Sequence, residues 1–156
     1  MIVSDAGPLI ILLKTGKLSI LKELSGTVNV PVAVYNEIIA REQEKALFQK
    51  MKWIKPVKIK KYNDFKLLEQ LVDTGEAEAI ILAKALKLPL LVDDAKARKY
   101  AALLNVEVMG TLGLLKQAKN HGVIASVKDT IKDMLAQGYY IDSKLIAKLL
   151  EDVGET

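Results

Sequence analysis

Short apolar runs alternate with longer helical patterns along the chain, as in proteins whose strands and helices alternate. The runs that predict β-strands lie at residues 1–4, 27–30, 89–92 and 106–109, with an extended lysine-rich piece between residues 45 and 64. Helical patterns fill the intervals, and two more helices are predicted at residues 126–136 and 142–151. This alternation predicts an α/β fold in three layers, α/β/α, with a short parallel sheet of four or five strands between helices.

The most informative stretch of the chain predicts a helix, a turn and a buried strand. Residues 77–88 are rich in helix formers and carry apolar side chains nearly all round, so the helix should be well covered. The apolar run 89–92 is typical of a parallel strand that is buried on both faces. Glu76 stands where this helix begins, and Asp93 and Asp94 stand where the strand ends.

Four acidic positions are expected to meet at one end of the sheet, because ligands in parallel α/β sheets bind beyond the carboxyl ends of the strands. Asp5 follows the first strand, Glu37 lies two turns into the helix after the second, and Glu76 begins the helix just described. Asp94, with its neighbour Asp93, follows the next strand. Like charges packed closely are costly unless a cation neutralises them. The pattern therefore predicts a site for a divalent metal ion.

Each of these carboxylates also has a structural explanation. Asp5 could cap the first helix, and one residue of the later aspartate doublet could cap the helix that follows it. Asp73 and Glu76 have the spacing of a capping box. Glu37 could pair with Arg41, one helical turn further on. The structural explanations act one residue at a time, whereas the metal site requires all the acids together.

The composition narrows the chemistry of such a site. The chain has no cysteine and a single histidine, His121, which excludes thiolate and histidine-rich metal sites. The remaining carboxylate oxygens suit Mg²⁺ or Mn²⁺. The natural chemistry of carboxylate-bound Mg²⁺ is hydrolysis of a phosphodiester. A net charge of +4 is compatible with a nucleic-acid partner without requiring one.

The N-terminus and the apolar segments bear on localisation. The opening run reaches Ser4 and Asp5 without a basic segment, so we expect no signal peptide. The longest apolar segments are too short to span a bilayer. We therefore expect a cytoplasmic protein with no membrane partner.

In this order, the acidic motifs resemble those of the PIN domain, the fold of metal-dependent ribonucleases that includes the toxins of VapBC toxin–antitoxin pairs. The matching motifs are residues 2–10, 30–38, 75–80 and 91–94, the last followed by Arg98 and Ala101. The segment 108–115 resembles one prokaryotic PIN subgroup of largely uncharacterised, toxin-like proteins. The resemblance implies a single PIN-like domain over residues 1–156, with the helices from about residue 126 as an extension of the same domain.

The resemblance also implies an activity and a set of site residues. The activity is that of a Mg²⁺- or Mn²⁺-dependent endoribonuclease that hydrolyses RNA by metal-activated water. Asp5, Glu37, Glu76 and Asp94 are the implied catalytic residues and metal ligands, with Asp93 able to substitute or assist. The third acid of the family is commonly aspartate, whereas this chain has Glu76, and Glu78 lies on a different face of the helix.

The implied partners are an RNA substrate and an antitoxin protein, and the apolar early helices lead us to expect a homodimer as well. Two other functions compete with the nuclease. One is a catalytically weak or inactive PIN fold that binds RNA or protein. The other is a phosphoacceptor receiver domain, which needs its acidic pair after the first strand, whereas the doublet here comes late in the chain.

Further residues have both a functional and a structural interpretation. Arg98 and Lys99 could contact phosphates, although a solvated helix face explains Lys99 better. The lysines between residues 50 and 61, with Trp53, could bind RNA by phosphate contacts and base stacking. The same lysines could instead discourage pairing at an edge strand.

Two apolar features bear on packing and assembly. Residues 9–13 and 18–24 form apolar helices that exceed the need of a small monomer, so we expect them to provide a dimer surface or an antitoxin-binding surface. Tyr139 and Tyr140 are expected to pack the C-terminal helices together.

Overall fold

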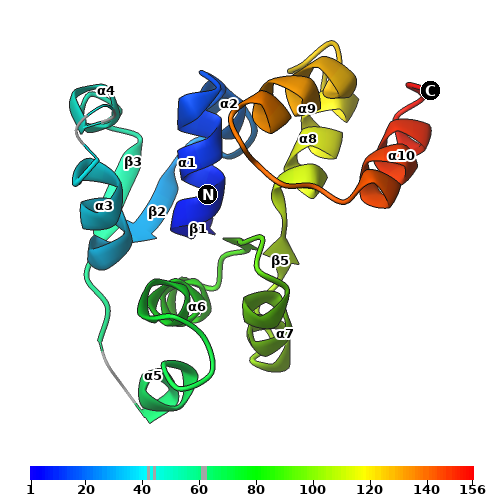
Figure 1. Cartoon of the computed structure of the whole chain (residues 1–156). Helices are drawn as coiled ribbons and strands as arrows, with labels where there is room; N and C mark the ends of the chain where they lie inside the picture. The colour runs from blue at the N-terminus through cyan, green and yellow to red at the C-terminus, as the bar shows by residue number, and fades with distance from the viewer. Residues whose placement is uncertain (42, 44, 61–62) are drawn as a thin grey trace.

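A five-stranded sheet, entirely parallel, forms the centre of the molecule (Figure 1). The computed structural model describes residues 1–41, 43, 45–60 and 63–156. The strand order is β3-β2-β1-β4-β5. The strands are β1 (Ile2–Ser4), β2 (Val28–Pro31), β3 (Ile54–Val57), β4 (Leu90–Leu91) and β5 (Val108–Met109).

The helices that connect and cover these strands follow the predicted order. They are α1 (Ala6–Lys14), α2 (Ser19–Ser25), α3 (Val32–Ile39), α4 (Lys45–Gln49), α5 (Asn63–Leu68), α6 (Thr74–Leu86), α7 (Ala95–Leu103), α8 (Thr111–Asn120), α9 (Val127–Ala136) and α10 (Ser143–Asp152). The prediction missed α4, which forms where an irregular segment was expected. None of the helices in the described ranges is long and apolar enough to cross a membrane.

Successive strand residues point to opposite faces of the sheet, and each face has its own apolar core. Ile2 and Leu91 belong to a core with α1–α4 and α8–α10, whereas Val3 and Leu90 belong to a core with α5–α7. Figure 1 shows α5, α6 and α7 below the sheet and α1, α8 and α9 above it. The predicted three-layer α/β/α fold is therefore confirmed.

The direction in which the chain adds strands to the sheet reverses between β1 and β4. The chain builds outward from β1 to β2 and β3, and then crosses through α5 and α6 to add β4 and β5 on the other side of β1. The backbone N–H of Asp5 donates to the carbonyl of Leu91 at 3.0 Å, so the ends of the two strands are held together. Such a switch point is where α/β sheets bind ligands.

The first two helices are covered by the chain itself, which corrects their predicted role. The side chains of Leu9, Leu12 and Leu21 are fully buried. They share a core with Leu114 of α8 and Ile131 of α9. The expectation of a dimer or antitoxin surface is therefore wrong for Leu9, Leu12 and Leu21, which lie inside the core of the protein itself.

The lysine-rich segment contains β3, which lies at one edge of the sheet. Lys55 is exposed on this strand, and the partly buried ring of Trp53 packs against the core. An exposed lysine on an edge strand discourages pairing with another chain. The predicted edge position of this segment is therefore confirmed, whereas RNA binding by its lysines and their effect on strand pairing stay predictions. Lys61, which belongs to the same run, lies outside the described residues.

Candidate metal centre

A cleft of about 360 Å³ at the carboxyl ends of β1 and β4 gathers six carboxylates. They are Asp5, Glu37, Asp73, Glu76, Asp93 and Asp94. The structure thus brings all five predicted site residues into one cleft and adds a sixth acid. Arg41 also lines the cleft and supplies a positive charge there. Glu78 is buried away from this lining, on another face of α6.

Asp5 enters the cleft directly from the end of β1. It occupies the N-cap position of α1, but within the described chain its side chain makes no capping hydrogen bond. The pKa of Asp5 is raised from 3.8 to about 6, mainly because the carboxyl is buried and further because Asp73, Glu37 and Asp93 are negative, while the N–H of Ala6 partly offsets these effects. The structural explanation for Asp5 is therefore not realised, and its carboxylate faces other acids.

Asp73 and Glu76 combine capping with a position in the cleft. The N–H of Glu76 donates to Asp73 Oδ1 at 2.7 Å, and the N–H of Asp73 donates to Glu76 Oε1 at 3.1 Å, which forms a capping box at the start of α6. Glu76 is only 9% exposed. Burial, together with the charges of Asp73, Asp94 and Asp5, raises its pKa to about 7. The capping box and a metal-binding role are compatible, since each carboxylate uses only one oxygen in the box.

The two residues of the aspartate doublet, Asp93 and Asp94, have different hydrogen-bond partners. Asp94 caps α7, because its Oδ1 accepts from the N–H of Ala97 at 2.8 Å. Asp93 Oδ1 accepts from the N–H of Thr111 at 2.7 Å, and its Oδ2 accepts from the hydroxyls of Thr111 and Tyr139, each at 2.6 Å. Both oxygens of Asp93 are therefore engaged, whereas Asp94 uses one. This difference favours Asp94 over Asp93 as a metal ligand.

Glu37 reaches the cleft from α3. The side chains of Val34 and Ile38 are buried on one side of this helix, and Glu37 lies on the exposed side. The predicted alternative, an ion pair with Arg41, is not formed among the residues that the structure describes. Both side chains line the cleft, so Arg41 contributes to its local charge without neutralising Glu37 directly.

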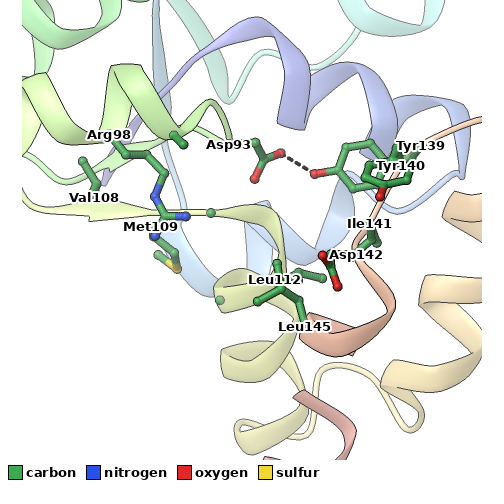
Figure 2. A pocket seen from close by; sticks show the side chains of 13 residues that line it. Asp93, Arg98, Val108, Met109, Leu112, Tyr139, Tyr140, Ile141, Asp142 and Leu145 are labelled. Carbon is green, nitrogen blue, oxygen red and sulfur yellow. Dashed lines mark hydrogen bonds between the residues drawn. The ribbon is translucent and has the colours of Figure 1, made fainter. Parts of the chain in front are cut away.

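Tyr139, in the segment between α9 and α10, belongs to this site, and sequence reasoning missed it. Its hydroxyl donates to Asp93, as the dashed line in Figure 2 shows. Burial and the adjacent carboxylate raise the pKa of Tyr139 above its ordinary value, so the phenol stays protonated and donates. Tyr140 is 86% exposed, and the prediction that it packs the C-terminal helices is therefore wrong. No local signal separates these two tyrosines, because the bond to Asp93 spans 46 residues.

Replacing Tyr139 with phenylalanine should destabilise the protein by about 1.5 kcal/mol, the lower end for a hydrogen bond to a charged group, because Thr111 continues to donate to Asp93. Urea unfolding of the purified variant measures this change. Tyr140→Phe is the matched control, since it removes the same hydroxyl from an exposed side chain and should leave stability unchanged. Equal stability of Tyr139→Phe and wild type would show that the bond does not contribute.

The acidic cleft fits a hard divalent cation in the kind and charge of its donors. Carboxylate oxygens suit Mg²⁺ and Mn²⁺. A cation here would stabilise the charged forms of Asp5 and Glu76, which burial and neighbouring negative charges disfavour. Over the described ranges, no group of three or more acidic or histidine side chains is placed so that it could hold a metal ion by itself. Mg²⁺ keeps several waters and needs only one or two carboxylates together with substrate phosphates. The site therefore fits such an ion as an open site.

An α/β sheet with an acidic cleft at its switch point defines a class of proteins suited to metal-assisted chemistry on phosphate esters. A family model described as a PIN domain matches residues 1–155, and the chain belongs to the PIN-domain family. PIN domains are generally nucleases and typically use divalent metal ions. The receiver-domain alternative is therefore wrong. No curated protein matches the chain.

Proposed function

We propose that this chain is a Mg²⁺- or Mn²⁺-dependent endoribonuclease. The observation that carries the proposal is the convergence of six carboxylates on one cleft at the switch point of a PIN fold. Two of these acids, Asp5 and Glu76, have a raised pKa because they are buried and because their neighbours are also negative. A cluster of this kind is stabilised by a bound cation.

In the proposed site, Asp5, Glu37, Glu76 and Asp94 would hold one or two metal ions, some of them directly and the others through water. A divalent ion held by these residues would supply activation of the attacking water and stabilisation of the leaving oxygen of the phosphodiester. Thr111 and Tyr139 fix Asp93, which holds the turn between β4 and α7 so that its neighbour Asp94 stays at the cleft.

A cleavage assay with purified protein tests the proposal. We expect single-stranded RNA to be cut at internal positions in Mg²⁺ or Mn²⁺, and cleavage to stop in EDTA and return when Mn²⁺ is restored in excess. Single-stranded DNA of the same sequence is the parallel substrate, and we expect it to remain intact. Cleavage that persists in EDTA, or RNA that stays intact with every divalent ion, would contradict a metal-dependent ribonuclease.

A second candidate function is an RNA- or protein-binding PIN fold with weak or no catalysis. The observation in its favour is that no three of the described acids form a ready metal cage. Intact RNA in the assay above, together with a melting temperature that does not respond to Mn²⁺, would favour this alternative over the nuclease.

We also propose that the nuclease acts in the cytoplasm as the toxin of a toxin–antitoxin pair. The support is the likeness of residues 108–115 to a toxin-like PIN subgroup, within a chain that belongs to the PIN family. An antitoxin protein and a homodimer are part of this proposal. Neither partner can contact Leu9, Leu12 or Leu21 of α1 and α2, because these side chains are fully buried.

A further inference from the structure

A larger hollow, of about 750 Å³, adjoins the acidic cleft. Asp93 lines both, so the two spaces meet at this residue. The hollow lies between α7, β5 and α8 on one side and the segment from Tyr139 to Asp142 on the other. Figure 2 shows Arg98 and Met109 on one side of it and the two tyrosines on the other. Neighbouring units of one extended ligand could therefore occupy the cleft and the hollow, with Asp93 between them.

The lining of the hollow is mostly apolar, with an exposed aromatic ring. Met109, Leu112, Ile141 and Leu145 contribute apolar surface. Tyr140 is 86% exposed, so its ring is accessible to a ligand beside this apolar surface. An apolar wall with an accessible aromatic ring suits a flat, partly apolar ligand such as a nucleobase, because base faces stack on aromatic side chains.

Arg98 places a positive charge where the hollow meets the cleft. Its side chain is exposed and forms no ion pair in the part of the chain that the structure describes. At Gly110, a Cβ atom would lie 3.5 Å from Arg98 Nη1 and 3.1 Å from Asp93 Oδ1, so this glycine allows both groups to approach the same point of the backbone. A guanidinium here matches a phosphate that leaves the cleft toward the hollow.

The cleft continues on its other side into a third hollow, of about 300 Å³, along α1. Gly7, Ile10 and Arg41 line both spaces, and Lys14 adds a second cation. Positive side chains therefore flank the six carboxylates on both sides. This alternation of charge matches a polynucleotide whose central phosphate lies at the acids and whose neighbouring phosphates lie at the cations.

Together with the proposed function, on which this step rests, the geometry points to a subsite for one nucleotide of the RNA. We propose that the hollow receives the unpaired base of a nucleotide next to the scissile phosphate, stacked on Tyr140, while Arg98 binds the adjacent phosphate. A base inside a duplex is stacked and paired on both sides and cannot enter such a hollow.

Binding of a labelled RNA tests this subsite separately from cleavage. The probe is a fluorescein-labelled single-stranded hexaribonucleotide, followed by anisotropy at several salt concentrations with Ca²⁺ in place of Mn²⁺. A gel verifies that the probe stays intact. Tyr140→Ala is compared with Tyr140→Phe, which keeps the ring. Arg98→Ala is compared with Lys96→Ala, an equal change of charge on the same helix outside the hollow.

Tyr140→Ala and Arg98→Ala should weaken RNA binding in different ways. Tyr140→Ala should weaken binding roughly tenfold or more, as expected for one lost base–aromatic stack, with an unchanged salt dependence, and Tyr140→Phe should bind like wild type. Arg98→Ala should lower the slope of log K against log salt concentration by about 0.7, the value for one phosphate contact on a single strand, and Lys96→Ala should not. Both residues are exposed, so thermal melting should be unchanged.

Three outcomes separate the subsite from the nuclease. Wild-type binding by Tyr140→Ala and Arg98→Ala would overturn the subsite, and metal-dependent cleavage of RNA by the same protein would leave the proposed function standing. Duplex RNA bound as tightly as the single strand would also overturn it. The expected binding pattern without any cleavage would support the hollow as a base-binding site and refute the nuclease.

Discussion

Asp5→Asn should abolish metal-dependent RNA cleavage while the protein remains folded. The substitution removes one negative charge from the carboxylates that hold the metal, and a metal ion at a phosphoryl centre contributes several kcal/mol to catalysis. At 1.36 kcal/mol for each factor of ten, we expect the rate to fall roughly 10²- to 10⁴-fold. The measurement is the initial rate of RNA cleavage over a titration with Mg²⁺ or Mn²⁺.

The melting temperature of Asp5→Asn, measured in EDTA, should be equal to that of wild type or higher. The asparagine side chain keeps the shape of the aspartate and removes the charge whose burial and repulsion raise the pKa of this carboxyl. Asp129→Asn is the matched control, because Asp129 is exposed on α9 and does not line the acidic cleft. Equal cleavage by wild type and Asp5→Asn across the metal titration would remove Asp5 from the site.

Without a divalent ion, the protein should be less stable at pH 8 than at pH 5. The folded pKa of Asp5 is raised, to about 6, so the stability it contributes is complete below its ordinary value of 3.8 and is lost as the pH rises through 6. The full effect is on the order of 3 kcal/mol, of which about 1.4 kcal/mol falls between pH 5 and pH 8. Glu76, whose pKa is raised to about 7, adds in the same direction.

Urea unfolding in EDTA at the two pH values measures this loss, and addition of Mn²⁺ at pH 8 should reverse it. A ligand that binds only the folded state stabilises it by mass action, and the deprotonated acids of the cleft are the form that binds a metal. Asp5→Asn should reduce both the pH effect and the response to Mn²⁺, whereas Asp129→Asn should change neither. Stability that rises from pH 5 to pH 8 in EDTA would contradict the placement of Asp5 among buried acids.

Much of the fold follows from patterns that are local in the sequence. The apolar runs at β1, β2 and β4 are short and buried on both faces, so their character as parallel strands is visible without coordinates. The convergence of Asp5 with the later doublet follows from one topological rule, since both end strands that pair in the sheet. The cleft was therefore predictable in outline, and so was the capping box at α6.

The errors concern contacts between segments that are distant in the sequence. Asp73 was assigned to capping alone, although the start of α6 also places it in the cleft. Leu9 and Leu12 share a core with Leu114 of α8 and Ile131 of α9, and no local pattern specifies this association of distant segments. Tyr139 and Tyr140 are chemically equivalent in the sequence, and only the path of the chain between α9 and α10 gives them opposite surroundings.

The hydrogen bond between Tyr139 and Asp93 joins the last quarter of the chain to the residues proposed for chemistry. The acids come from segments before residue 95, whereas Tyr140, Ile141 and Leu145 belong to a later segment. Under the proposals above, substitutions in that later segment would alter which RNA sequences are preferred and leave the hydrolytic groups untouched. Relatives that diverge there while retaining their acids would share one reaction and differ in their targets.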